Sequence, residues 1–171
     1  MPVRIIVSDS SCLIDLRKAS LLDVFLRLPY EILIPNTLFE EELIRFTVEQ
    51  KETLVRGGLQ IMDLPGESVL RAQEVVGALP HLSIHDGFAF ALAERNPGCI
   101  LLTGDGGLRK LGLEHRMEVH GMLWLIDEIH ANGLASTERL LTILRAFADD
   151  PLVRLPKREL ALQIRRYERG D

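Results

Sequence analysis

The sequence predicts an α/β fold in which a central parallel sheet lies between two layers of helices. Short apolar segments rich in Val, Ile and Leu recur along the chain, and helical spacing of apolar residues follows most of them. Strands that alternate with helices form parallel sheets, whose strands are apolar because both faces are covered. With 171 residues and 47% hydrophobic content, the chain can bury such a core. We therefore expect a three-layer α/β/α sandwich with a C-terminal helical extension.

Strands are predicted where short apolar runs end at turn-forming residues. These runs are residues 3–7, 32–34, 59–62, 99–102 and 118–120. Helices are predicted over residues 12–18, 20–28, 35–46, 69–79, 83–94, 122–131, 137–148 and 156–167. The segment 83–94 is apolar on nearly every face, which indicates a helix that is buried on most sides.

No linker or repeat divides the chain clearly. We predict one domain over residues 1–135 and a helical extension over residues 136–171, packed on the same domain. The extension ends in a basic arm, because six bases and only three acids lie between Pro151 and the C-terminus, whereas the whole chain carries a net charge of −5. The arm is either a solvated helix face or a surface that binds a polyanion.

Composition excludes several classes of protein. No apolar run is long enough for a signal peptide or a membrane-spanning helix, so we expect a cytoplasmic protein. Cys12 and Cys99 have no metal-ligand spacing and should be reduced and packed. The five histidines form no ligand pair on one helix face, although His85 lies beside Asp86.

Carboxylates occur where predicted strands meet helices. Asp9 and Asp105 each follow a strand, Asp86 lies in the first turn of a helix, and a run of three glutamates ends at Glu42. Ligands bind at the carboxyl edge of parallel sheets, so these acids can lie near one another. Carboxylate oxygens suit Mg²⁺ or Mn²⁺, and such ions promote phosphodiester hydrolysis.

Each acid also has a purely structural interpretation. Asp9 can cap the helix that follows it, and Ser83 with Asp86 has the spacing of a capping box. Asp105 can be an ordinary turn residue between glycines, and the glutamates can form a solvated helix face. A capping residue can still bind a metal ion, so both interpretations remain open.

These positions together resemble the PIN-domain ribonucleases. Residues 7–11 (VSDSS) are similar to the first strand-end motif of that family, residues 83–89 (SIHDGFA) to its third acidic motif, and residues 101–108 (LLTGDGGL) to its fourth. The second family acid is a Glu followed by Leu, which Glu42 matches best, with Glu41 as the alternative. The resemblance covers residues 3–125, and residues 121–125 look like the closing segment of the family.

The resemblance implies an Mg²⁺- or Mn²⁺-dependent endoribonuclease whose site is formed by Asp9, Glu42, Asp86 and Asp105. Thr103 and either Ser10 or Ser11 would hydrogen-bond to the ligands. Many small members, including the virulence-associated protein C toxins, are toxins of toxin–antitoxin pairs, and many are dimers. The resemblance therefore extends to an RNA substrate, an antitoxin partner and a homodimer. The two helices and basic arm beyond Leu125 depart from the shortest toxins.

A binding scaffold, a phosphatase and a receiver domain are alternatives to a ribonuclease. A PIN-like scaffold that has lost catalysis and acts by binding a partner is the main alternative, although the presence of all four acids argues against it. A haloacid-dehalogenase-type phosphatase would need an Asp where Ser11 stands. A receiver domain would need an acidic pair near the first strand and a Lys after a late strand, and the sequence has no clear match.

Overall fold

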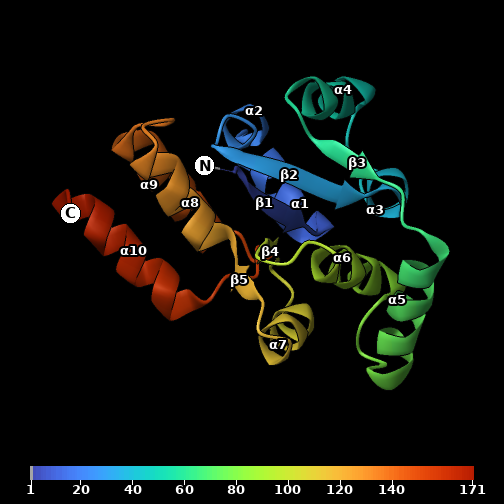
Figure 1. The fold of residues 1–171 in the computed structure, drawn as a ribbon. Coiled ribbons are helices and arrows are strands. Elements are labelled where there is room, and N and C mark those ends of the chain that lie inside the picture. The colour runs from blue at the N-terminus through green and yellow to red at the C-terminus, as the bar shows by residue number, and fades with distance from the viewer. Residues whose placement is uncertain (1) are drawn as a thin grey trace.

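The computed structural model describes residues 2–171, and within them the chain forms five strands and ten helices (Figure 1). The strands are β1 (Arg4–Ser8), β2 (Tyr30–Pro35), β3 (Gln60–Met62), β4 (Ile100–Leu102) and β5 (Glu118–His120). They form one parallel sheet in the order β3-β2-β1-β4-β5. Each predicted strand is present, and the predicted parallel sheet is confirmed.

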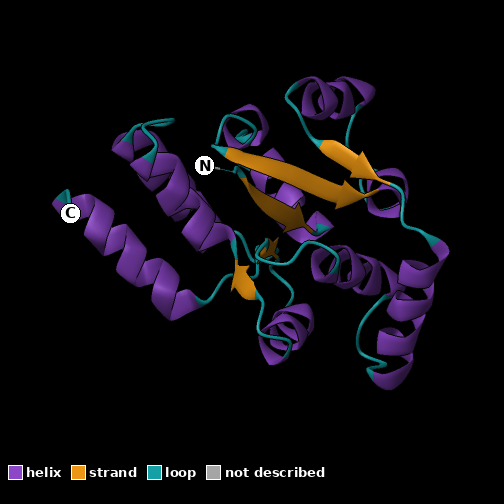
Figure 2. Ribbon diagram, in the orientation of Figure 1, coloured by secondary structure: helices purple, strands orange, loops and turns teal. Residues whose placement is uncertain are grey.

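Helices surround this sheet (Figure 2). They are α1 (Ser10–Lys18), α2 (Leu22–Phe25), α3 (Asn36–Glu41), α4 (Val48–Arg56), α5 (Gly66–Ala78), α6 (Ile84–Glu94), α7 (Gly106–Glu114), α8 (Met122–Ala131), α9 (Thr137–Asp149) and α10 (Lys157–Arg169). The helices predicted near α1, α5, α6, α8, α9 and α10 agree with the structure to within a few residues. The helix predicted over residues 20–28 shortens to α2.

Two separate cores fill the spaces between the layers. Successive strand residues point to opposite faces of a sheet. Ile6 and Leu102 accordingly pack with α1, α2, α8, α9 and α10 on one face, whereas Val7 and Leu101 pack with α5, α6 and α7 on the other. All four of these strand residues are fully buried. The three-layer α/β/α sandwich predicted from the sequence is therefore present.

The segment after β2 differs from the prediction. The helix expected over residues 35–46 ends at Glu41, although Leu43 and Phe46 remain buried. A separate helix, α4, then begins at a capping box in which the side chains of Thr47 and Gln50 each bond the backbone of the other. This cap fixes the start of α4 at Val48. Helix α7, which follows β4, was not predicted either.

The C-terminal helix is attached to α8 through one carboxylate. Oδ1 of Asp127 accepts hydrogen bonds from the Tyr167 hydroxyl at 2.7 Å, from Nε2 of Gln163 at 2.9 Å and from the Arg166 guanidinium at 2.6 Å. Leu160 and Tyr167 belong to the same buried cluster as Ile6 of β1. Helix α10 thus packs on the helices that cover this face of the sheet, through both apolar and polar groups.

No helix in residues 2–171 has both the length and the apolar character needed to cross a membrane.

Replacing Asp127 by Ala is expected to lower the free energy of unfolding by about 2 kcal/mol, because the partly buried Tyr167 and Gln163 donors lose their shared acceptor. Chemical denaturation measures this change. Asp127→Asn is the matched control, since it keeps an acceptor oxygen and should cost less. Equal losses in both variants would show that the charge, and not the acceptor, stabilises this attachment.

Candidate active site

Asp9 lies at the carboxyl end of the central strand and caps helix α1. Its side chain is buried, and Oδ1 accepts from the Ser11 backbone N–H at 3.0 Å, from the Ser11 hydroxyl at 2.6 Å and from the Cys12 N–H at 3.4 Å. Oδ2 accepts from the Thr103 hydroxyl. The capping role that the sequence allowed is therefore confirmed, and hydrogen bonds hold both carboxylate oxygens of Asp9 in place.

The surroundings of Asp9 shift its pKa upward. Burial raises the pKa to about 6, because the charged form loses its hydration. The hydrogen bonds from Ser11, Thr103 and Cys12 act in the opposite direction, and the negative charge of Asp86 raises the pKa further. The charge of Asp86 is thus a minor contribution beside burial.

A hydrogen-bonded turn joins Asp9 to Asp105. The Gly104 N–H donates to the Ser11 hydroxyl at 2.8 Å, and the Asp105 N–H donates to the Thr103 hydroxyl at 3.0 Å. A Cβ added at Gly104 would lie 3.2 Å from Oγ of Ser11, so the close approach of the two turns favours glycine there. The ends of β1 and β4 are thus linked through two hydroxyl groups.

Asp105 and Asp86 both occupy helix N-termini. Oδ1 of Asp105 accepts from the Leu108 N–H at 2.8 Å and so caps α7. Oδ2 of Asp86 accepts from the Ser83 N–H at 2.9 Å, which completes the capping box predicted for α6. Within residues 2–171 the second oxygen of each carboxylate makes no hydrogen bond. Each acid therefore keeps one oxygen available while it caps a helix.

The two candidate glutamates have different neighbours. Oε2 of Glu41 lies 3.0 Å from Nε2 of His85, which brings this side chain to the first turn of α6, beside Asp86. Glu42 is partly buried just after the last residue of α3. Its carboxylate makes no hydrogen bond or ion pair with any residue in the described part of the chain. Of the two glutamates, Glu41 is therefore the one with a recorded polar contact to α6.

The acids suit a hard cation by their chemistry, since all offer carboxylate oxygens and Asp9 is a buried charge that a cation would stabilise. Across residues 2–171, however, no three His, Cys, Asp or Glu side chains lie close enough together to hold a metal ion. The hydrogen bonds of Asp86 and Asp105 turn each carboxylate toward its own helix. A shared ion would therefore require one or both of these side chains to rotate.

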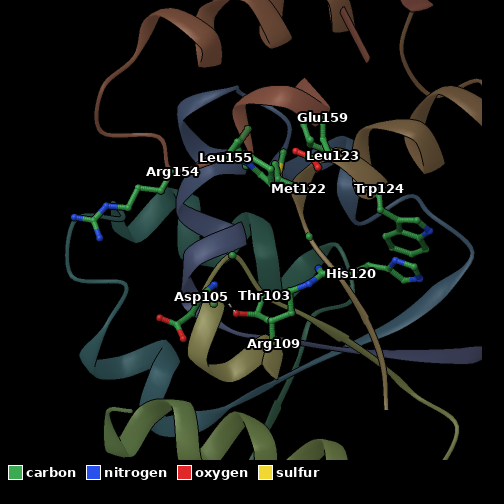
Figure 3. Close-up of a pocket in the computed structure, with 14 residues that line it drawn as sticks. Thr103, Asp105, Arg109, His120, Met122, Leu123, Trp124, Arg154, Leu155 and Glu159 are labelled. Carbon is green, nitrogen blue, oxygen red and sulfur yellow. Dashed lines mark hydrogen bonds between the residues drawn. The ribbon is translucent and has the colours of Figure 1, made fainter. Parts of the chain in front are cut away.

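A cleft of about 520 Å³ opens beside Asp105. The turn after β4, the turn after β5 and the linker between α9 and α10 form its walls, and we call it the linker cleft. Its lining residues include Thr103, Asp105, Arg109, His120, Met122, Leu123, Trp124, Arg154, Leu155 and Glu159. Figure 3 shows the stacked rings of His120 and Trp124 at one end and the side chains of Asp105 and Arg154 at the other. No pattern in the sequence predicts this cleft.

The protein is a three-layer α/β/α domain. Its candidate site lies at the carboxyl edge of the sheet, beyond the ends of the adjacent parallel strands β1 and β4. The family model described as a PIN domain matches residues 5–169. The chain therefore belongs to the PIN-domain family, as the sequence motifs predicted. The match extends through α9 and α10, so the helices beyond Leu125 also lie within it. No curated protein and no solved structure matches the chain.

PIN domains are typically nucleases, and they commonly use Mg²⁺ or Mn²⁺. The family thus indicates, at a coarse level, a hydrolase that acts on nucleic acid. This agrees with the class of activity inferred from the carboxylates.

The raised pKa of Asp9 predicts how stability depends on pH in the absence of metal. The folded protein binds the Asp9 proton more tightly than the unfolded chain, so this contribution is complete below the ordinary pKa of 3.8 and is lost as pH rises through about 6. We expect the wild type to lose about 3 kcal/mol relative to Asp9→Asn across this range. Urea denaturation in EDTA measures the difference. A difference that does not change with pH would mean that Asp9 titrates near its ordinary value.

Proposed function

We propose that the protein is a metal-dependent ribonuclease that hydrolyses phosphodiester bonds of RNA. The observation that carries this proposal is the buried Asp9 carboxylate, fixed by Ser11 and Thr103 and close enough to Asp86 to feel its charge. Burial and a like charge both disfavour the ionised form of this carboxyl group. Groups with such shifted pKa values are concentrated at functional sites.

Asp9, Asp86 and Asp105 would bind Mg²⁺ or Mn²⁺ together with one acid from the end of α3. The pairing of Glu41 with His85 supports Glu41 for the fourth position over Glu42, which the sequence motif favoured. When bound, the ion supplies Lewis acidity that lowers the pKa of water and offsets charge on the phosphoryl oxygens. Asp86 and Asp105 would each offer the oxygen that is not used in capping, after rotation of one or both side chains.

The surrounding groups of this chain set the charge and position of the acids. With its pKa at about 6, Asp9 is mostly ionised at neutral pH and can act as a ligand. The Thr103 hydroxyl donates to Asp9 and accepts from the Asp105 N–H, so it fixes the spacing between the two acids. Hydrogen-bonded neighbours of this kind orient metal ligands.

The test is cleavage of a mixed single-stranded RNA pool with Mn²⁺ or Mg²⁺, with EDTA, and with Asp86→Asn purified in parallel. Metal-dependent cleavage by the wild type that the variant lacks would support the proposal and exclude a contaminating nuclease. If the wild type neither cleaves nor binds Mn²⁺ by calorimetry, the catalytic proposal fails. A non-catalytic scaffold that binds a partner then becomes the better explanation.

The two glutamates provide a matched comparison in the same assay. We expect Glu41→Gln to lower the rate by about 10-fold or more, as loss of a metal-site group does, and Glu42→Gln to leave it nearly unchanged. The opposite ranking would restore Glu42 as the second family acid.

The toxin role, the antitoxin partner and the homodimer stay predictions from the family resemblance. The boundary between residues 1–135 and 136–171 also stays a prediction.

A further inference from the structure

Charged, apolar and aromatic groups line the linker cleft, and Glu159 lies beside Leu123 within it (Figure 3). Figure 3 shows Asp105 and Arg154 at one end, and His120 stacked on Trp124 at the other, with ring centroids 4.3 Å apart and planes 8° from parallel. Met122, Leu123 and Leu155 contribute apolar surface between them. A ligand that fits has a charged part and a flat aromatic part.

The cations of the linker cleft are not neutralised by neighbours. Within residues 2–171, the guanidinium groups of Arg109 and Arg154 form no ion pair or side-chain hydrogen bond. Some other arginines form ion pairs, for example Arg166 with Asp127 and Arg145 with Glu168, whereas surface arginines such as Arg165 form none among the described residues. Two unpaired arginines beside an acidic site suit an anionic group, and phosphate is the anion that Arg binds most readily in nucleic acids.

The stack at the other end is held rigidly. Nε2 of His120 lies 2.9 Å from Oε1 of Glu118, and Glu118 also pairs with Arg4 on β1. The Tyr30 ring packs against Trp124 with a centroid distance of 6.1 Å. Rigid aromatic groups beside a basic surface are the usual way in which proteins bind single-stranded nucleic acid without reading its sequence.

We propose that the linker cleft binds one nucleotide of single-stranded RNA adjacent to the scissile phosphate, with its phosphate at Arg109 and Arg154 and its base against His120 and Trp124. This inference rests on the proposed ribonuclease function and adds a substrate subsite to it. The volume of about 520 Å³ lies within the roughly 300–1,000 Å³ of small-ligand sites. Thr103 and Asp105 belong to both the cleft and the acid site. The bound strand would therefore pass directly from the cleft to the acid site.

The subsite also gives the C-terminal region a role. Arg154 and Leu155 belong to the linker between α9 and α10, and Asp127 holds α10 in place behind it. The acidic body of the protein repels phosphate, and the linker supplies a cation where the strand must pass. The basic arm would therefore act mainly at Arg154, and much less through its charge as a whole.

Binding of a short fluorescein-labelled single-stranded RNA in EDTA, followed by anisotropy, tests the subsite without cleavage. We expect Arg109→Gln combined with Arg154→Gln to weaken binding by about 10-fold or more, and to reduce the salt slope by roughly 0.7 for each phosphate that is no longer neutralised. Arg165→Gln is the control, because Arg165 is an exposed base of α10 that lies outside the cleft. It should bind like the wild type, and circular dichroism verifies that all variants fold.

Trp124 is the single tryptophan of the chain, so its fluorescence reports on the base end of the cleft. Unlabelled RNA should change the Trp124 emission of the wild type in a saturable way, at the concentrations at which it binds. RNA binding that leaves this emission unchanged would overturn the proposal. So would an Arg165→Gln defect as large as that of the Arg109→Gln and Arg154→Gln double variant, because binding would then follow the general charge of the arm.

The outcomes separate this subsite from the nuclease proposal. Binding in EDTA that depends on Arg109 and Arg154, in a protein that never cleaves RNA with metal present, would support the cleft as an RNA site and reject catalysis. Metal-dependent cleavage with RNA binding that is indifferent to both arginines would reject the cleft and keep the nuclease.

Discussion

Replacing Asp9 by Asn is expected to lower metal-dependent RNA cleavage by about 100-fold or more, because the variant removes the central charged ligand of the proposed metal site. Asn keeps an acceptor oxygen for the Ser11 and Cys12 N–H groups, so helix α1 should retain its cap. In EDTA at neutral pH the variant should even be more stable than the wild type, since a buried charge is removed.

Asp15→Asn is the matched control for this experiment. Asp15 lies on α1, the helix that Asp9 caps, and burial raises its pKa too, but the charges that act on it are those of Lys18 and Asp150. Cleavage and unfolding should be measured on the same preparations. An Asp9→Asn variant that cleaves as fast as the wild type would reduce Asp9 to a helix cap and reject its role as a ligand.

Replacing Phe90 by Ala is expected to lower the free energy of unfolding by about 3–5 kcal/mol. Phe90 is fully buried on α6, its ring packs edge-on against His115 at the end of α7, and Arg71 of α5 lies over it. The cavity would loosen the helices that carry Asp86 and Asp105. Thermal melting should show a lower Tm by about 10 °C.

Leu70→Ala serves as the comparison for Phe90, because Leu70 lies on α5 with 66% of its surface exposed. Its loss should change stability by less than about 0.5 kcal/mol. Similar losses in both variants would mean that the core beneath α6 is not tightly packed.

The sequence was sufficient for the sheet but not for every helix. Strands β1 and β4 are continuous apolar runs, and such runs have few alternatives in a covered sheet. Helix α4 was missed because Leu54 is its one fully buried residue, so its apolar periodicity is weak, and only Thr47 and Gln50 marked its start. Helix α7 was missed because two glycines follow Asp105, where a turn was the simpler interpretation.

The places of the candidate acids in the fold were predictable, but the geometry of their side chains was not. Element boundaries located Asp9, Asp86 and Asp105, and the Ser83 capping box was evident from spacing. The direction of each side chain depends on hydrogen bonds made after folding, such as that from Thr103 to Asp9. The linker cleft was beyond prediction because its walls come from three segments that only the folded sheet and α10 bring together.

The hydrogen bond between Thr103 and Asp9 joins residues that are 94 positions apart in the chain. Because Asp9 precedes β4 in the chain, it is synthesised well before β4 and the turn that follows it. A nascent chain that ends before β4 lacks Thr103 and Asp105, so it cannot assemble the proposed site. Under the proposed function, a partly synthesised chain would therefore be unable to cleave RNA until β4 and the turn after it have been made and folded.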